Sequence, residues 1–161
     1  MKKGKSSKSW RQKLEKEMEP KIVEVPERWA EKIGRGRMLV PSPMLVDKTI
    51  RAIPSSKLAT VNIIRDKLAH DYHADMACPL TTGIFLNIAA NVAEEDKQDH
   101  KKNITPYWRV VKEDGSLNPK YPGGIEQQAK YLKKEGFTIV YGKNKEKLYV
   151  KNFDKNMYAF E

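Results

Sequence analysis

Two helical patterns joined by a short break restrict the fold more than any other feature of this chain. Residues 55–72 and residues 78–95 each place apolar side chains at three- and four-residue steps, which is the spacing of one helix face. The break between them reads HADMA. Two helices joined this closely predict a helix-turn-helix unit. In the second helix, the side chains that share a face are Leu80, Ile84, Ile88 and Val92.

The segments around this pair predict a mainly α-helical domain with a small β component. Ser42 is a good helix cap and Pro43 suits a first helical turn, so a helix is expected over residues 42–53. Helices followed by a basic terminal hairpin favour a winged-helix-like domain. The remaining expected elements are two short elements around the loop at 34–37, a strand over 106–111, a helix over 125–136, and strands over 137–142 and 147–153.

The 161 residues are enough for one domain, which we place at 21–161, preceded by a Lys-rich arm at 1–20. The arm is expected to be flexible or partly helical, and either lies along phosphates or is a solvated tail. A net charge of +10 and a pI near 9.6 favour a polyanionic partner, of which nucleic acid is the commonest. A well-solvated basic surface is the alternative.

Several other classes of protein are disfavoured. No apolar run is long enough to span a bilayer, and the N-terminus lacks the apolar core of a secretory signal, so we expect a cytoplasmic protein without membrane contact. Cys78 is the only cysteine, which excludes an internal disulfide and a cysteine-rich zinc site. His70 and His73 have ligand-like spacing, but no further ligands clearly follow them. We therefore expect no metal and no cofactor.

The stretch PYWRVVKEDGSLNPKYPGGIEQQAKYLKKEGF, residues 106–137, resembles the C-terminal domain of the alkylguanine-DNA alkyltransferases and the alkyltransferase-like proteins. That family carries Pro-Cys-His-Arg-Val, a turn with Gly, a Gly-Gly pair, and a helix ending near Leu-x-x-Glu-Gly. The resemblance extends more weakly over residues 43–140, and it implies the fold of that domain with residues 79–89 as the recognition helix. The matching positions are Pro106, Arg109, Val110, Gly115, Gly123, Gly124, Leu132, Glu135 and Gly136.

Two departures from the family motif bear on function. The transferases use the motif cysteine as a sacrificial nucleophile activated by the adjoining histidine, whereas this chain has Tyr107 and Trp108 there. A phenol with a pKa near 10 is a poor nucleophile at neutral pH, and indole offers no base. We therefore expect no catalytic residue at this motif. Alkyltransferase-like proteins also lack the cysteine and bind damaged DNA. By this resemblance, the pocket positions are Pro106, Tyr107, Trp108, Arg109 and Glu135.

The family also flips its target nucleotide, with a Tyr on the first helix of the pair and an Arg finger on the recognition helix. The corresponding positions are Val61 and either Pro79 or Leu80, and residues 74–96 contain no Lys or Arg. Nothing in the sequence clearly offsets the cost of flipping. For Arg109, we expect an ion pair with Glu135 that holds the strand to the last helix.

Duplex DNA is the expected partner, bound by a monomer, with altered bases as candidate targets and a repair protein as a possible further partner. By resemblance, Thr81, Thr82 and Gly83 allow close approach to the minor groove. Two alternatives stay open: an RNA- or protein-binding module on the same scaffold, and residual alkyl transfer through Cys78. The expected phosphate contacts are Lys48, Arg51, Lys57, Arg65, Lys101 and Lys102, with Lys143, Lys145 and Lys147 on the hairpin.

Overall fold

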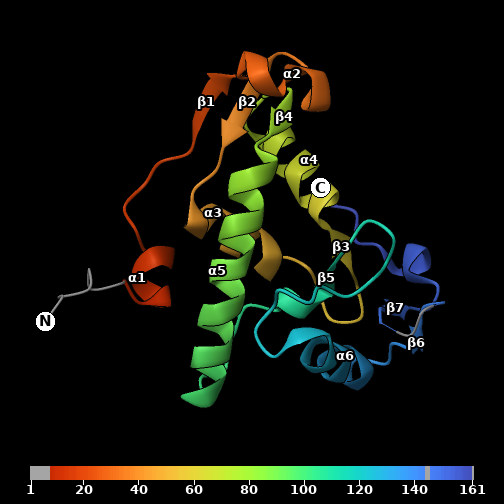
Figure 1. Ribbon diagram of the computed structural model, residues 1–161. Helices are drawn as coiled ribbons and strands as arrows, with labels where there is room; N and C mark the ends of the chain where they lie inside the picture. The colour runs from red at the N-terminus through yellow and green to blue at the C-terminus, as the bar shows by residue number, and fades with distance from the viewer. Residues whose placement is uncertain (1–7, 144–145, 161) are drawn as a thin grey trace, which may run out of the picture.

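A computed structural model describes residues 8–143 and 146–160 and has a mainly α-helical fold, as the sequence predicts (Figure 1). The long helix α5 (Pro79–Gln98) runs along the front of the molecule. The remaining helices are α1 (Trp10–Leu14), α2 (Glu27–Ile33), α3 (Pro43–Arg51), α4 (Val61–Asp71), α6 (Gly124–Lys134) and the 3-10 helices η1 (Tyr107–Arg109) and η2 (Phe153–Asn156).

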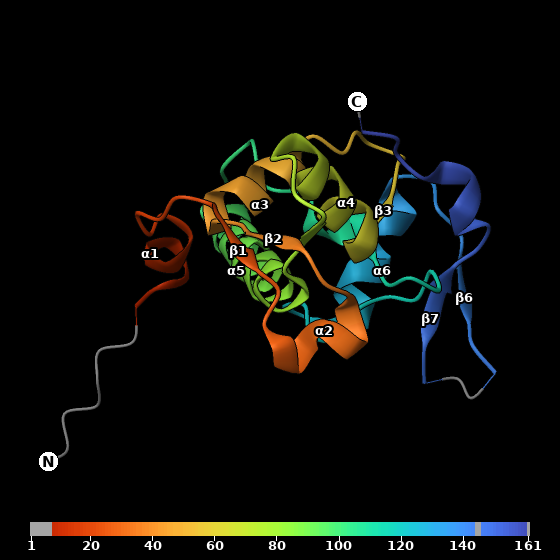
Figure 2. The same ribbon diagram turned by 90° about the horizontal axis from the view of Figure 1, so that it is seen from above.

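The strands of the described residues form small, separate sheets. β1 (Lys21–Glu24) is antiparallel to β2 (Arg37–Val40), and β2 is parallel to β4 (Met76–Ala77). β3 (Ala59–Thr60) runs parallel to β5 (Val110–Val111). The terminal hairpin pairs β6 (Ile139–Tyr141) with β7 (Leu148–Val150) and lies on the opposite side of the molecule from α1 (Figure 2).

The caps explain where the helices before α5 begin. The Oγ of Ser42 accepts a hydrogen bond from the Leu45 amide at 3.1 Å, and Pro43 opens α3, as predicted. The next helix begins later than the predicted residue 55. Thr60 caps it through the Ile63 amide at 3.2 Å, because Thr60 itself belongs to β3. α4, the turn with β4, and α5 form the predicted pair of closely joined helices.

The prediction of a strand over residues 106–111 is wrong for most of its length. Residues 107–109 form the 3-10 helix η1, closed by a 3.1 Å hydrogen bond from the Arg109 amide to the Pro106 carbonyl, and only residues 110–111 are extended. A strand would send Tyr107 and Trp108 to opposite faces. The tight turn instead buries both: Tyr107 is 0% and Trp108 8% exposed. Burial of two adjacent aromatic rings therefore overrides the strand pattern.

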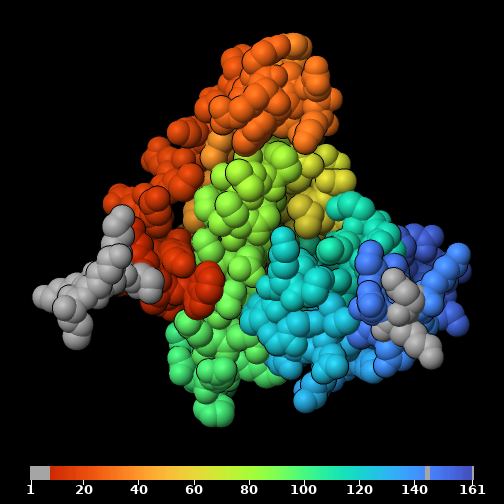
Figure 3. All heavy atoms as spheres, viewed as in Figure 1, coloured from red at the N-terminus to blue at the C-terminus, as the bar shows by residue number. Residues whose placement is uncertain are grey.

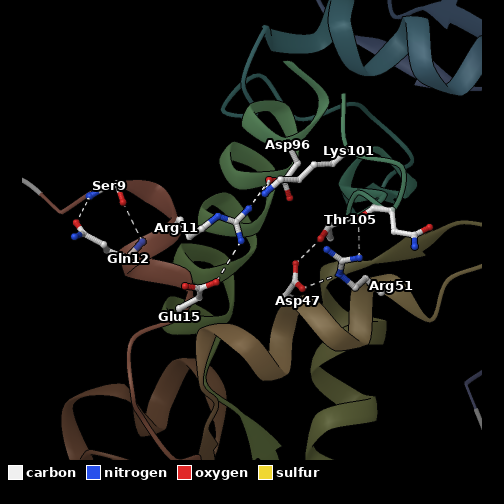
Figure 4. Close-up of polar contacts among 10 residues, drawn as sticks. Ser9, Arg11, Gln12, Glu15, Asp47, Arg51, Asp96, Lys101 and Thr105 are labelled. Atoms are coloured by element: carbon white, nitrogen blue, oxygen red, sulfur yellow. Dashed lines mark hydrogen bonds and ion pairs between the residues drawn. The ribbon is translucent and has the colours of Figure 1, made fainter. Parts of the chain in front are cut away.

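The part of the N-terminal arm that forms α1 is packed against the protein and is not a solvated tail. Ser9 and Gln12 form a capping box, and Leu14 is 4% exposed because it packs against Ile88 and Val92 of α5. Figure 4 shows Arg11 reaching the carboxylate of Asp96 on α5. A five-residue helix is not stable by itself, so these contacts hold α1 in place. Residues 1–7 of the arm lie outside the described residues.

Leu14→Ala is expected to release α1 without unfolding the domain. The variant loses about 2 kcal/mol of packing against α5, which should speed amide exchange in α1 about thirtyfold. The amides to follow by hydrogen exchange are those of Lys13 and Glu15, which donate to Ser9 and Arg11. Lys16→Ala, at an exposed position just after α1, is the control and should leave exchange unchanged. Equal protection in both variants would contradict docking through Leu14.

Candidate nucleic-acid interface

One face of α5 is open to solvent and carries apolar rather than basic side chains. Leu80 and Ile84 lie one turn apart and are 57% and 48% exposed. Gly83 lies between them and faces open space. Because residues 74–96 contain no Lys or Arg, this face is free of positive charge. A helix with such a face can approach another surface closely.

The recognition-helix residues expected from the sequence divide between two faces. Gly83 lies on the open face and Thr81 is half-buried. Thr82 is only 1% exposed and points into the protein, away from the open face. The helix period causes this division, since three successive positions cannot share one face of a helix.

The open face of α5 forms one wall of a groove of about 750 Å³. In Figure 3, α5 (green) lies between α1 (red) and the segment around residue 120 (cyan). Val61 at the start of α4 and Tyr121 line the groove, as do the side chains of Asn87 and Asn118. The groove thus brings together Val61 and Leu80, the positions at which the family has its flipping Tyr and, in one alignment, its finger.

Three lysines line the groove from outside α5. Lys13 comes from α1, and Lys112 and Lys120 come from the segment after β5. The Nζ of Lys13 lies 4.3 Å from the ring centroid of Trp10, which also lines the groove. Within residues 8–143 and 146–160, none of these lysines has a carboxylate partner. Lys13 belongs to the arm that was expected to lie along phosphates, whereas Lys112 and Lys120 were not expected, because their place beside α5 depends on tertiary packing.

Tyr107, at the cysteine position of the family motif, lies in the core. Its hydroxyl donates to Oε2 of Glu94 at 2.7 Å, and its ring packs edge-on against Tyr121 with centroids 5.0 Å apart. Burial raises the pKa of the Tyr107 hydroxyl far above its ordinary value, and the hydrogen bond to Glu94 raises it further. The phenol is therefore neutral at physiological pH, and it is also inaccessible. Neither property suits a nucleophile.

The predicted pairing of Arg109 with Glu135 is confirmed. The Arg109 Nε donates to both Glu135 oxygens at 3.0 Å, and the two side chains are only 15% and 11% exposed. Glu135 also accepts from the Trp108 Nε1 at 2.6 Å and from the Ser56 amide at 2.8 Å. The carboxylate thus accepts hydrogen bonds from three donors and holds residues 108–109 of the motif against the end of α6.

The five pocket positions expected from the resemblance lie close together, but they pack against one another and do not line the groove along α5. The groove along α5 has none of Pro106, Tyr107, Trp108, Arg109 and Glu135 in its lining. A separate hollow of about 480 Å³ is lined by Pro106, Trp108 and Arg109 with Arg51 and Lys102. Tyr121, whose ring contacts Tyr107, is the link between the motif and the groove. The sequence placed Tyr121 within the family-like stretch but did not mark it as a site residue.

Several expected phosphate contacts have structural partners instead. Arg51 pairs with Asp47 at 2.9 Å, Arg65 donates to the Ala77 carbonyl at 2.9 Å, and Lys101 pairs with Asp96 at 3.3 Å. Figure 4 shows the Arg51 and Lys101 contacts. None of the six expected side chains lines the groove. Lys48, Lys57 and Lys102 are exposed and have no ion-pair partner among the described residues.

The remaining sequence candidates lie apart from the groove. Cys78 precedes α5 and is 2% exposed, so a substrate does not reach its thiol in this conformation. Lys143 and Lys147 belong to the β6–β7 hairpin, while Lys145 lies outside the described residues. In the part of the chain that the structure describes, no three His, Cys, Asp or Glu side chains group as metal ligands. None of its helices combines the length and apolar character needed to cross a bilayer.

Comparison with known proteins gives a match in structure only. No family model and no curated protein matches the sequence. Two crystal structures match its fold. They are S. pombe Atl1 in complex with damaged DNA containing O6-carboxymethylguanine, and S. pombe ATL in complex with DNA. In each, the TM-score is 0.51 and the identity 19%, over 73% of this chain and 94% of the other. The chain has the alkyltransferase-like fold. The resemblance in residues 106–137 is thus confirmed at the level of fold.

Glu135→Ala is expected to lower the free energy of unfolding by about 3 kcal/mol, because it leaves Arg109 buried without its partner. Urea denaturation followed by tryptophan fluorescence measures the change. Glu126→Ala is the matched control, since Glu126 is exposed on α6 and should change stability by less than about 0.5 kcal/mol. Equal stabilities of the two variants would show that the ion pair does not hold the motif.

Proposed function

We propose that the protein binds duplex DNA along the α5 groove and senses altered bases without covalent chemistry. The observation that carries this proposal is the combination of an uncharged, apolar helix face with unpaired lysines beside it. Lysines bind phosphates regardless of sequence, while an uncharged helix with Gly83 at its centre can lie close to the base edges. The fold match to Atl1, whose structures contain DNA, supports the same partner.

The proposal of altered bases rests on the polar residues that line the groove. Asn87, Asn118 and Tyr121 are among them. The Asn87 Oδ1 is buried, and within the described residues it has no hydrogen-bond partner. Amides pair with base edges, and a base turned out of the duplex is read by such contacts together with apolar walls. Asn87 therefore lines the groove and also carries a buried acceptor for which the described residues supply no donor.

The proposal includes no covalent transfer of an alkyl group, because the two candidate acceptor side chains are inaccessible. Tyr107 is fully buried, with its hydroxyl held protonated by burial and by Glu94. Cys78 is 2% exposed. An acceptor of an alkyl group must reach the damaged base, and neither side chain does in this conformation. Binding without transfer is the activity that this site supports.

Fluorescence anisotropy tests the proposal with two matched duplexes, one of which contains an O6-alkylguanine. Affinity for both should fall steeply with salt, because bound phosphates release counterions. The modified duplex should bind more tightly. Equal, salt-sensitive affinities would reject lesion sensing but keep DNA binding. Absence of binding to either duplex would contradict the whole proposal and point to RNA or protein as the partner.

Charge reversal at the groove lysines locates the interface. Lys13→Glu, Lys112→Glu and Lys120→Glu together should reduce the slope of log affinity against log salt by about 3, one for each lost phosphate contact. The control combines Lys48→Glu, Lys57→Glu and Lys102→Glu, which makes the same change of charge at exposed lysines that do not line the groove. A greater loss of slope in the control would place DNA on another face.

A further inference from the structure

We propose that the β6–β7 hairpin is a second nucleic-acid site, which binds unpaired nucleotides of single-stranded DNA by stacking on Tyr141 and Tyr149. The inference goes beyond the proposed function, because it needs no duplex in the α5 groove. The hairpin lies on the opposite side of the molecule from α1, which carries one wall of that groove (Figure 2). Among the described residues, none that lines the groove belongs to the hairpin.

Two tyrosines and two lysines surround a hollow of about 610 Å³ at the end of the hairpin. Tyr141 ends β6, Tyr149 lies in the middle of β7, and the lysines are Lys143 and Lys147. Gly142 completes the lining. Aromatic rings stack on bases and lysines bind phosphates, so this hollow offers both of the contacts that a nucleotide needs.

Tyr141 is available for such a contact. It is 73% exposed, the largest value among the exposed large apolar side chains of the described residues. No other aromatic ring of the described chain packs against Tyr141 or Tyr149. An exposed ring is unfavourable in water in proportion to its apolar area. A ligand that covers the ring of Tyr141 therefore gains that free energy.

The hairpin holds the ring of Tyr149 in place. A side-chain carbon at Gly142 would lie 2.6 Å from Cε1 of Tyr149, so the ring packs directly on the glycine backbone. β7 is also held on its other edge, because the Val150 amide donates to the Gly115 carbonyl at 3.0 Å. A side chain that is fixed before binding loses little entropy when a ligand orders it.

Charge favours a polyanion at the hairpin. Residues 141–151 contain four lysines and one glutamate. Within the described part of the chain, Lys143 and Lys147 form no ion pair. Hydrogen bonds from Ser116 lower the pKa of Asp114, and the charge of Lys147 lowers it further. Asp114 therefore offsets part of the charge of Lys147, and the hairpin as a whole keeps an excess of positive charge beside its aromatic rings.

The tyrosines select unpaired nucleotides over a duplex. Inside a duplex, neighbouring pairs cover the faces of each base, whereas a single strand exposes them, and every base has such a face. An acidic peptide would neutralise the lysines but would not explain the two rings, and a second copy of the chain would bring like charges together. The choice of DNA over RNA rests on the proposed function, since a damaged duplex opens easily and leaves unpaired DNA nearby.

Fluorescence anisotropy with a labelled oligothymidine of about 10 nucleotides tests the site, because this strand forms no duplex and has the length that such surfaces contact. The wild-type chain should bind it with an affinity that falls with salt. Tyr141→Ala should bind about tenfold more weakly, whereas Tyr141→Phe, which keeps the ring, should bind as wild type. Val140→Ala is the matched control, because Val140 is 38% exposed on the same strand and does not line the hollow.

The outcomes separate this site from the proposed function. Absence of binding by the wild-type chain, wild-type affinity in Tyr141→Ala, or an equal loss in Val140→Ala each overturns the hairpin site. Oligouridine bound far more tightly than oligothymidine would identify RNA as the ligand and overturn the assignment to DNA. An equal loss of duplex binding in Tyr141→Ala would mean one shared surface rather than a second site. Failure of the wild-type chain to bind any duplex rejects the proposed function, but oligothymidine binding that depends on Tyr141 would still support the hairpin site.

Discussion

The arrangement of the site depends on the hydrogen bonds and the ion pair that the carboxylate of Glu135 forms. It accepts hydrogen bonds from the Ser56 amide, the Trp108 indole and the Arg109 guanidinium. Arg109 in turn donates to the Ile53 carbonyl at 2.7 Å, just after α3. One largely buried ion pair therefore links the end of α6, the 3-10 turn of the motif and the segment between α3 and β3. With one partner removed, the other would be a buried charge without compensation.

This link determines what the motif segment can do. Because Trp108 and Arg109 are held from one side, Tyr107 points into the core, where Glu94 accepts hydrogen bonds from the hydroxyls of Tyr107 and Tyr131. The aromatic rings fill the space that a reactive centre would need. Among the described residues of this aromatic cluster, Tyr121 is the one that reaches the groove on the other side. The motif packs behind the groove, and the groove itself is lined by α5 and the segment after β5.

The sequence predicted those features that depend on local patterns. The order of helices and the cap at Ser42 follow from periodicity and capping chemistry. The Arg109–Glu135 pair was expected as a structural contact between opposite charges. In contrast, η1 forms because this turn buries the rings of both Tyr107 and Trp108. The alternation of residues along a strand does not predict such a turn. The positions of Lys112 and Lys120 beside α5 likewise depend on long-range packing. The sequence could not separate Thr82 from Gly83 because the helix face was unknown.

Docking of α1 and occupation of the groove are thermodynamically linked. The contacts of Leu14 and Arg11 with α5 hold a helix too short to persist alone, and the same helix brings Trp10 and Lys13 to the groove. Any ligand that contacts Lys13 binds the docked form more tightly than the undocked form. By reciprocity, that ligand stabilises docking by the same free energy. In the proposed complex, the basic arm would contribute to binding in two ways: through its charge, and through the wall of the groove that α1 forms.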